Sequence, residues 1–379
     1  MAKVQIPFNK QAELPGDLEL VSQAIKSGQC AGNGPFGKQC EDLLEEILGC
    51  PRVLMTTSCT HALEMVGLLL DLQVGDEVIV PSYTFVSTAN SFALRGATIR
   101  FCDIREDTLN LDETKLEQLV NDNTRLVVPV HYGGVACNMS AIMELADRAG
   151  IEVVEDNAHG LFAGFSGQPL GTFGGFATQS FHETKNFSCG EGGALLINKE
   201  NLVERAEVVR DKGTDRSRFF RGEVNKYSWK DLGSSYVISD ILSAVLLKQL
   251  EHREEITKRR KQLWIRYLVE LEDWSVACGA RLPFIPPKCE QPYHIFYLVM
   301  QSEDARNEFI RLLRSKGIGA VFHYLPLHES EFIREHQNAG DSCPVASEMS
   351  RRLVRLPLYY NLTDEEQSEV IEAVKSFEY

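Results

Sequence analysis

The feature that most constrains this chain is an alternation of short β-rich runs with helical patterns, which starts at about residue 52. Each run has a nearly continuous apolar centre, which is typical of strands buried on both faces of a mostly parallel sheet. The alternation therefore predicts an α/β fold with helices covering the sheet. The predicted strands are RVLMTTS (52–58), DEVIVPS (76–82), TIRFCDI (98–104), TRLVVPVHY (124–132) and IEVVEDN (151–157).

The rhythm changes after residue 173. GGFATQSF (174–181) and GGALLIN (192–198) are only about ten residues apart, which leaves no room for a crossover helix and predicts neighbouring strands. The loop between them, HETKNFSCGEGG, is predicted to be functional. Residues 199–211 have a helical pattern, and residues 212–236 are irregular, polar and locally basic. A long charged helix is predicted to begin near Ser239 and to break around Trp274.

Two unequal lobes are expected, because 379 residues exceed what one hydrophobic core usually serves. We place a large lobe at 1–250 and a small C-terminal α/β lobe at 251–379. The small lobe contains the extended segment HIFYLVM, a helix through ARNEFIRLLRSKG, the segment AVFHYLPL and a terminal helix.

The charge balance and the chain's start limit the classes of function. There are 39 Lys and Arg against 54 Asp and Glu, a net charge of −15, which argues against nucleic-acid binding.

The ten cysteines form no CxxC pair, so no metal site is predicted. The start has no pattern of a secretion signal, and no apolar run has the length of a membrane span. We therefore expect a cytoplasmic protein that acts away from membranes.

Asp156 is the first candidate functional residue, because it closes the apolar strand IEVVEDN and precedes His159. Ligands of α/β sheets collect at strand ends, and a carboxylate there can pair with a cation such as a protonated pyridine nitrogen. The alternative is an ordinary helix N-cap.

Lys185 is the second candidate, and it lies in the glycine-rich loop that ends in CGEGG. A lysine that forms a Schiff base needs a partly neutral amine, which burial and nearby cations promote. The glycines would let the backbone pass close to a bound ring. The alternative is a solvated surface lysine.

The third candidate is TTSCTHALEM, where a strand runs into a helix. A phosphate could be bound there by the N–H groups of Cys59 and Thr60 and by the hydroxyls of Ser58 and Thr60. The alternative is that Ser58 simply caps the helix. Ser180 would add another hydroxyl. In PSYTFVSTANSF, Phe85 follows a strand end, where its ring could stack on a planar cofactor or belong to the core.

Together these motifs resemble the DegT/DnrJ/EryC1/StrS family of sugar aminotransferases. The motifs that carry the resemblance are TSCT, PSYTFVSTAN, PVHYGGVACNM, Asp156 with His159, S-F-x-x-x-K-N followed by G-E-G-G, FHYLPLH and RLPLYYNLT. The resemblance covers nearly the whole chain. It implies the aspartate-aminotransferase fold (fold type I) and pyridoxal 5′-phosphate as cofactor. Related sugar dehydratases have histidine in place of the lysine, so Lys185 favours an aminotransferase.

The resemblance also implies a role for each motif residue. Lys185 would hold the cofactor covalently and move protons, and Asp156 would pair with the pyridine nitrogen. His159 would approach the phenolic oxygen, Phe85 would cover one ring face, and the phosphate would be held by Cys59, Thr60 and Ser180. Family members complete this site from a second subunit with a G-x-N-x-R segment. Here that segment is 233–237, with Ser235 and Val237 in place of the Asn and Arg. A homo-oligomer, at least a dimer, is therefore expected.

Within the family, SFHETKN and GSSYVISD are most similar to enzymes that aminate C4 of dTDP-4-keto-6-deoxyglucose with L-glutamate to give the galacto product. The C4 epimer (gluco), a 3-keto sugar, a UDP carrier, or a non-catalytic module on the same scaffold remain alternatives. We predict that a basic loop binds the substrate, with a solvated surface loop as the alternative; its residues are Lys212, Arg216, Arg218 and Arg221. Two histidines of the small lobe, His323 and His328, are also predicted to bind the substrate, with a structural role as the alternative.

Overall fold

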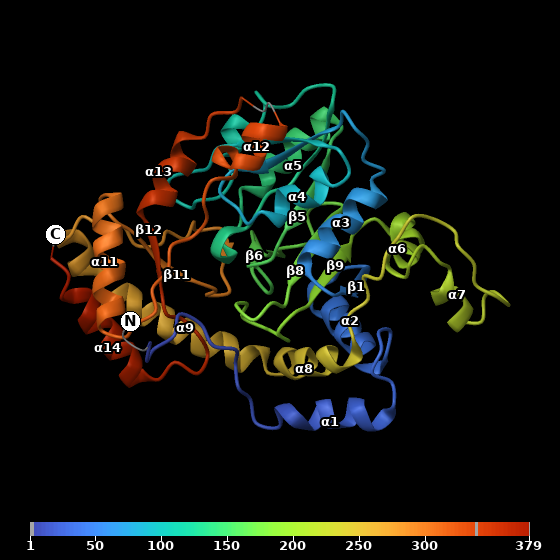
Figure 1. Cartoon of the computed structure of the whole chain (residues 1–379), viewed down its shortest axis with the longest axis horizontal. Coiled ribbons are helices and arrows are strands. Elements are labelled where there is room, and N and C mark those ends of the chain that lie inside the picture. The colour runs from blue at the N-terminus through green and yellow to red at the C-terminus, as the bar shows by residue number, and fades with distance from the viewer. Residues whose placement is uncertain (1–3, 338–339, 379) are drawn as a thin grey trace.

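A seven-stranded sheet forms the centre of the molecule in the computed structural model, which describes residues 4–337 and 340–378 (Figure 1). The strand order is β1-β9-β8-β5-β4-β2-β3. The strands from β8 to β3 are parallel, and β9 is antiparallel to both of its neighbours. The bounds are β1 (Arg52–Thr56), β2 (Glu77–Pro81), β3 (Thr98–Cys102), β4 (Thr124–Val127), β5 (Glu152–Asp156), β8 (Phe176–Ser180) and β9 (Gly193–Ile197). The predicted mostly parallel α/β sheet is confirmed.

Helices cover both faces of this sheet, because the strand side chains alternate between separate apolar cores. Leu54 packs with α3 and α4, whereas Val53 and Met55 pack with α2 and α8. On the β2 side, Ile79 packs against α5. The bounds are α1 (Asp17–Ser27), α2 (Pro35–Leu48), α3 (Cys59–Leu69), α4 (Ser87–Ala93), α5 (Met139–Ala149) and α6 (Val203–Arg210), with the 3-10 turns η1 (Glu113–Lys115), η2 (Tyr132–Gly134) and η3 (Glu200–Leu202).

The long C-terminal helix that we predicted is divided into three: α8 (Asp240–Glu251), α9 (Arg253–Glu270) and α10 (Glu272–Ala277). Its start is as expected, because the Ser239 hydroxyl caps α8. His252 separates α8 from α9 with φ −98° and ψ 18°, and its ring lies 3.1 Å from the Lys248 carbonyl, an acceptor at the end of α8. Among the described residues, no helix is both long and apolar enough to cross a membrane.

The small lobe is built on a two-stranded antiparallel sheet of β11 (Phe296–Val299) and β12 (Leu353–Leu356). AVFHYLPL forms no regular strand and contributes a single bridge, from Val321 to Arg355 of β12. The other elements of this half are β10 (Cys289–Glu290), α11 (Glu303–Ser315), η4 (Leu327–Glu329), α12 (Glu331–His336), α13 (Pro344–Arg352) and α14 (Asp364–Lys375). β10 pairs with the short hairpin of β6 (Gly164–Phe165) and β7 (Gln168–Pro169).

The lobe boundary that we predict at residues 250–251 falls beside the junction of α8 and α9. One apolar core gathers side chains from Leu263 to Phe377 together with Ile6 from the N-terminal segment. Ile333 and Met349, although they belong to the C-terminal part of the sequence, pack with the core of the large lobe. The C-terminal segment therefore contributes to both cores.

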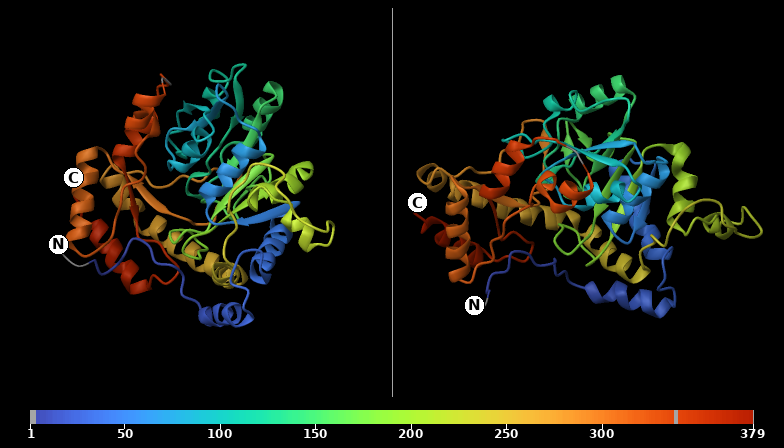
Figure 2. Two further views of the ribbon diagram at one scale, coloured as in Figure 1. Left: turned by 45° about the vertical axis from the view of Figure 1, so that its right-hand side comes forward. Right: turned by 45° about the horizontal axis from the view of Figure 1, so that its top comes forward.

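Residues 212–236 are named here the arm. Its middle part stands away from the body of the protein (Figures 1 and 2), whereas Tyr236 at its end is buried in the core of the large lobe. We predicted an irregular segment, and the structure adds one short helix, α7 (Arg216–Phe220). Hydrogen bonds from Gly213 and Ser234 to Val208 and Val209 hold the two ends of the arm against α6.

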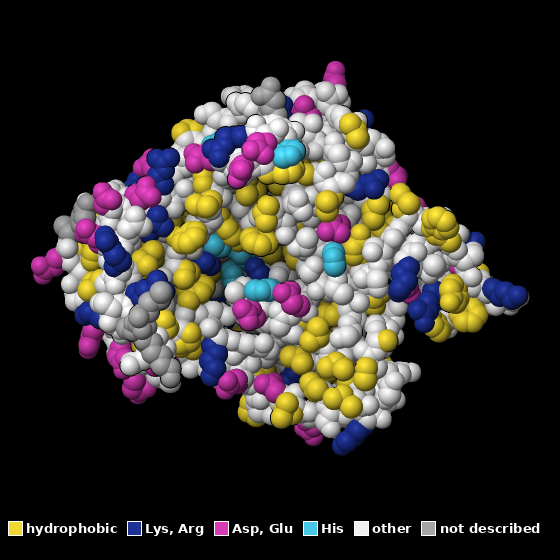
Figure 3. All heavy atoms as spheres, in the orientation of Figure 1, with side chains coloured by type: hydrophobic (Ala, Val, Ile, Leu, Met, Phe, Trp, Pro, Cys, Tyr) yellow, Lys and Arg dark blue, Asp and Glu magenta, His cyan; other side chains and the backbone are white. Residues whose placement is uncertain are grey.

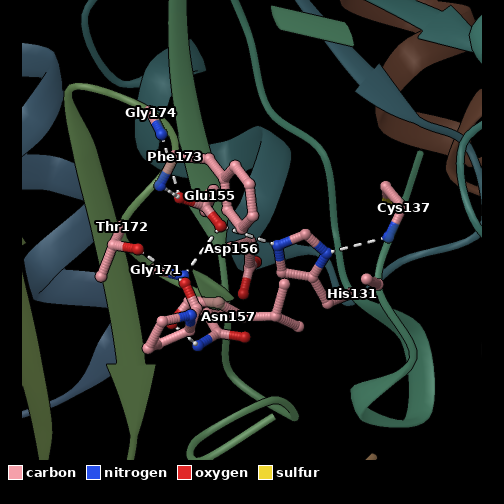
Figure 4. A network of polar contacts seen from close by, with 12 residues as sticks. His131, Cys137, Glu155, Asp156, Asn157, Gly171, Thr172, Phe173 and Gly174 are labelled. Carbon is pink, nitrogen blue, oxygen red and sulfur yellow. Dashed lines mark hydrogen bonds and ion pairs between the residues drawn. The ribbon is translucent and has the colours of Figure 1, made fainter. Parts of the chain in front are cut away.

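A buried carboxylate, Glu155, organises the loops beside the end of β5 (Figure 4). Its oxygens accept hydrogen bonds from the N–H groups of Gly171 (2.8 Å), Phe173 (2.7 Å) and Gly174 (3.0 Å). The fourth partner is Nε2 of His131 at 3.0 Å. Nδ1 of that ring accepts from the Cys137 N–H, so a neutral His131 carries its hydrogen on Nε2 and donates to Glu155.

Replacing Glu155 with Ala should lower the free energy of unfolding by about 3–5 kcal/mol, because buried N–H groups would lose their acceptor. Urea and thermal unfolding of the cofactor-free protein measure this change. Glu117→Ala is the control, since Glu117 is exposed and makes one ion pair, with Arg148 at 3.4 Å, worth about 0–1 kcal/mol. Equal losses in the two variants would contradict the role given to Glu155.

Candidate active site

The three motifs selected from the sequence meet at the carboxyl ends of β5 and β8. These strands are parallel neighbours, and Asp156 lies opposite Thr178 in their register. Thr178 accepts a hydrogen bond from the Cys59 thiol at 3.3 Å, which brings the start of α3 to the same edge. In the space-filling view, the face of the molecule has a central hollow with histidine and basic side chains at its bottom (Figure 3).

Asp156 is 5% exposed, and its carboxylate is held by neutral donors. Oδ2 accepts from the Thr88 hydroxyl at 2.7 Å, and Oδ1 accepts from the Ala158 N–H at 3.2 Å. The next regular element is the strand β6, so Asp156 closes a turn and does not cap a helix. Within the described part of the chain, no cation lies within ion-pair distance of it. The carboxylate is therefore available to a cationic ligand.

Lys185 is partly buried in the loop between β8 and β9. Burial is the largest cause that lowers its pKa, to about 8, and the positive charge of Arg355 acts in the same direction. The negative charge of Asp156 opposes this shift, which places the carboxylate near the amine. A substantial share of the amine is neutral near physiological pH, as a nucleophile requires.

The start of α3 combines free N–H groups with hydroxyls. Ser58 is the N-cap, and its Oγ accepts from the His61 N–H at 3.1 Å, so the capping alternative is correct for this side chain. The N–H groups of Cys59 and Thr60 lie in the first turn, where no intrahelical acceptor is available. The Thr60 hydroxyl pairs with that of Ser87 at 2.8 Å. This end of α3 is suited to a phosphate group.

Gly193 in the GEGG motif lies where the neighbouring backbone leaves no room for a side chain. A Cβ at this position would lie 2.3 Å from the Cys59 nitrogen and 2.3 Å from the Ser58 carbonyl carbon. The glycine thus lets β9 pass directly against the first turn of α3. The approach that requires a glycine here is to the protein's own helix, and the predicted passage of these glycines close to a bound ring stays a prediction.

His159 belongs to a cluster of aromatic rings. Its Nδ1 accepts from the Gly133 N–H at 3.2 Å, which leaves the hydrogen of the neutral ring on Nε2. The ring centroid lies 4.5 Å from that of His294 and 6.0 Å from that of His323. Burial holds the pKa of all three histidines well below the ordinary value. They are therefore neutral at pH 7.

His323 is the predicted substrate residue that the structure brings into this cluster. Its Nδ1 lies 2.8 Å from the Tyr132 hydroxyl, and its backbone carbonyl accepts from Tyr83. Tyr324 reaches Nε2 of His159 at 3.4 Å. Sequence reasoning missed Tyr132, Tyr324 and His294. Tyr324 lies in FHYLPLH and Tyr132 in PVHYGGVACNM, but neither was assigned a role, and no motif marks His294.

His328 has a different setting. Its Nδ1 lies 2.6 Å from the Ser82 hydroxyl, its Nε2 lies 3.5 Å from that of Ser347, and its ring is against Phe101. These contacts agree with the alternative of a structural histidine.

Phe85, Ser180 and Ser235 all lie at the periphery of the hydrogen-bonded site. Phe85 is 56% exposed with its ring 6.2 Å from that of Tyr324, and its stacking on a cofactor stays a prediction. Ser180 makes one long contact, from the His182 N–H at 3.5 Å. Ser235 is exposed and precedes Tyr236, whose carbonyl accepts from Thr57.

The basic loop lies on the arm and is neutralised by acidic side chains. Lys212 pairs with Asp211, Arg218 with Glu204 and Glu223, and Arg221 with Glu207 and Glu223. Arg216 lies over the ring of Phe220. Because the arm stands away from the body, these residues do not join the cluster around His159 in the same chain. Their predicted role in substrate binding would require a second subunit.

A mostly parallel α/β sheet with a lysine and a carboxylate near its strand ends is consistent with an enzyme of the aspartate-aminotransferase fold class, and the comparisons with known proteins show this class. A family model for the DegT/DnrJ/EryC1/StrS aminotransferase family matches residues 13–375, and the chain belongs to this family. The spore coat polysaccharide biosynthesis protein SpsC of Bacillus subtilis (strain 168) is 32% identical over 367 residues, which cover 95% of this chain and 93% of that protein.

Solved structures show the same relationship. The putative sugar aminotransferase Spr1654 from Streptococcus pneumoniae, in its PLP-form, superimposes with a TM-score of 0.89 at 25% identity and covers 98% of both chains. The aminotransferase TlmJ from Streptoalloteichus hindustanus gives a TM-score of 0.89 at 29% identity, again over 98% of both chains. The chain is thus an aminotransferase of the pyridoxal-phosphate-dependent class.

The residues present fit this cofactor. Asp156 offers a buried carboxylate without a cationic partner among the described residues, which suits a protonated pyridine nitrogen. The first turn of α3 offers N–H groups and hydroxyls to the phosphate, and Gly193 keeps that turn against β9. Lys185 supplies the amine.

Capture of pyridoxal phosphate by the cofactor-free protein should become faster with rising pH and level off with a midpoint near 8, because the neutral Lys185 amine is the nucleophile. Stopped-flow absorbance of the cofactor measures the rate. Lys185→Ala should show no covalent capture, whereas Lys199→Ala, in which an amine paired with Glu152 is removed, should behave like the wild type. A rate still rising above pH about 10, the ordinary range of lysine, would contradict the assignment.

Proposed function

We propose that this aminotransferase transfers the amino group of L-glutamate to C4 of dTDP-4-keto-6-deoxyglucose, giving dTDP-4-amino-4,6-dideoxygalactose and 2-oxoglutarate. The observation that carries the reaction type is the partly neutral Lys185 amine near the buried Asp156 carboxylate. The choice of sugar rests on the resemblance of SFHETKN and GSSYVISD to enzymes that use this substrate. The amino group and the ketone oxygen exchange places, so no external oxidant or reductant is needed.

Asp156 keeps a proton on the pyridine nitrogen, because a buried carboxylate favours a cationic partner. Bound pyridoxal phosphate then supplies an electron sink for the pair of electrons released when a C–H bond breaks. Lys185 takes the proton from Cα of the amino donor and later delivers a proton to C4 of the sugar. The face of the sugar presented to Lys185 decides the configuration at C4.

The aromatic cluster forms the wall on which the sugar is positioned. His323 and Tyr324 enter it from the C-terminal segment, and Tyr132 enters from the loop after β4. Because Gly133 and Tyr132 occupy the Nδ1 atoms of His159 and His323, the Nε2 atom of each neutral ring is the one that can hydrogen-bond to a hydroxyl group of the sugar. Such a surface recognises a sugar ring without adding charge to the site.

The arm is our candidate for the contact between two subunits. Phe220 and Trp229 are 63% and 78% exposed, and Phe219, Tyr227 and Leu232 are exposed on the same segment. Exposed aromatic side chains gathered on a projecting segment are typical of protein–protein interfaces. Packing of the arm on a second copy would also cover the segment around Ser235, which the resemblance places at the cofactor site of the partner.

Purified protein loaded with pyridoxal phosphate should aminate dTDP-4-keto-6-deoxyglucose in the presence of L-glutamate, and NMR of the product should show the axial C4 amine of the galacto isomer. The same assay with a 3-keto sugar and with a UDP-linked 4-keto sugar tests the alternatives. An equatorial C4 amine would indicate the gluco isomer. Protein that aminates none of these substrates would overturn the proposed substrate class.

The double substitution Phe220→Glu and Trp229→Glu should shift the protein from dimer to monomer in analytical ultracentrifugation, because charges would replace apolar contacts in the interface. Phe284→Glu is a matched control on the small lobe, where a 47% exposed aromatic side chain is changed. A wild-type protein that sediments as a monomer would contradict the role given to the arm.

A further inference from the structure

Asn186, the residue that follows Lys185, is fixed by two hydrogen bonds to one distant segment. Its Nδ2 donates to the Pro292 carbonyl at 2.7 Å, so its Oδ1 is the acceptor that lies 2.8 Å from Nδ1 of His294. The side chain is 9% exposed. Both polar atoms of the amide are therefore engaged, and the loop between β8 and β9 is attached to residues 292–294 directly beside its lysine.

His294 supports two residues of the candidate active site. Because Oδ1 of Asn186 carries no hydrogen, the neutral His294 ring has its hydrogen on Nδ1 and donates it. Burial is the largest cause that holds the pKa of His294 well below the ordinary value, and the charge of Lys185 acts in the same direction, which places the ring near the amine. The ring centroid also lies 4.5 Å from that of His159. One side chain thus contacts both the lysine loop and the His159 ring.

Residues 292–295 are themselves held by α9 of the small lobe. Arg260 donates from Nε to the Tyr293 carbonyl at 3.1 Å and from a terminal nitrogen to the His294 carbonyl. Trp264 donates from Nε1 to the next carbonyl along the chain at 3.0 Å. Three consecutive carbonyls are therefore fixed by two side chains of one helix, which gives Asn186 a rigid partner.

The segment keeps this position at a cost in free energy. Tyr293 has φ +55°, in the left-handed region that a tyrosine seldom adopts. Arg260 is 3% exposed, and no carboxylate of the described residues lies within ion-pair distance of it. A buried guanidinium without an acidic partner is destabilising, and a strained backbone persists where the surroundings determine it and a function needs it. Both features indicate that the placement of this segment matters to the site.

We propose that Asn186 and His294 are positioning residues, which hold Lys185 and His159 in the geometry for transamination and join the lysine loop to the small lobe. This inference rests on the proposed function, in which the Lys185 amine moves a proton. The amine must reach Cα of the amino donor and later C4 of the sugar, and a misplacement of about 1 Å can lower such a rate about a hundredfold. A fixed backbone beside Lys185 leaves the necessary motion to its side chain.

The test separates positioning from binding. Reaction of the pyridoxal-phosphate form with L-glutamate, without sugar, is followed by the loss of visible absorption over a range of donor concentrations. Asn186→Ala and His294→Phe should each lower the maximal rate about tenfold or more and leave the half-saturating concentration within about twofold, because the amine is displaced and the donor is still bound. Gln11→Ala is the matched control, since it removes an amide that donates to the Ser188 carbonyl of the same loop at 3.3 Å, and it should react like the wild type.

Two further variants identify the hydrogen bond as the cause. His294→Asn places an amide N–H about where Nδ1 stands and should recover part of the rate, whereas His294→Phe keeps a ring and loses the donor. The double variant of Asn186→Ala and His294→Phe should react within about twofold of the slower single variant, because both changes break the same contact.

A third measurement uses the cofactor-free protein. In Asn186→Ala the midpoint for capture of pyridoxal phosphate should rise from near 8 by about one pH unit, because a loosened loop lets water reach the Lys185 amine and burial is the largest cause of its lowered pKa. This variant leaves unchanged the groups that face the amine, which are Asp156, Arg355, Cys59, His159, His294 and His323.

The outcomes distinguish this inference from the proposed function. Wild-type rates in Asn186→Ala and His294→Phe, or a loss in His294→Asn as large as that in His294→Phe, overturn the inference and leave the proposed function standing. Wild-type protein that reacts with no amino donor overturns the proposed function, and the inference with it. Thermal unfolding shows which variants keep the fold, and since the two single variants break one contact from its two sides, either of them is sufficient for the test.

Discussion

The reversal of chain direction between β8 and β9 is the constraint on which the site depends. Five parallel strands bring their carboxyl ends to one edge of the sheet, where β5 places Asp156. A further parallel strand would have carried the chain away through a crossover helix. The antiparallel return of β9 instead keeps the loop with Lys185 at this edge. β9 then passes the first turn of α3 at Gly193, so the same strand positions both the lysine loop and the start of α3.

The local charge in the candidate active site differs from the net charge of the whole protein. The chain has a net charge of −15, yet Asp156 is the carboxylate that acts on Lys185, and the neighbouring cation is Arg355. Burial keeps the nearby histidines neutral. On the arm the basic loop is neutralised, because Glu204 and Glu207 of α6 and Glu223 pair with its arginines. An anionic substrate therefore meets a local field that the net charge does not describe.

The strands and the central residues could be predicted from the sequence because their signals are local. Apolar runs buried on both faces mark the parallel strands, and Asp156 and Lys185 stand at strand ends within recognisable motifs. The rest depends on contacts between distant segments. The Arg355 guanidinium is directed by the pairing of β12 with β11 and by Phe8, and the arm's basic residues find acidic partners on α6. The long helix breaks at His252 and at Leu271, whereas the break predicted around Trp274 falls within α10.

The contacts of Tyr83 with the His323 carbonyl and of Ser82 with His328 have a consequence for motion. Both join the turn after β2 to the segment 323–328, so this stretch is anchored to the large lobe although it lies within the C-terminal half of the sequence. Ile333 and Met349 extend the same attachment. The neighbouring residues tie the same stretch to the β11–β12 sheet, because Val321 bridges Arg355 and the Phe322 carbonyl accepts from the Arg355 guanidinium. The segment therefore couples the two lobes, so a movement of the small sheet would be transmitted to His323.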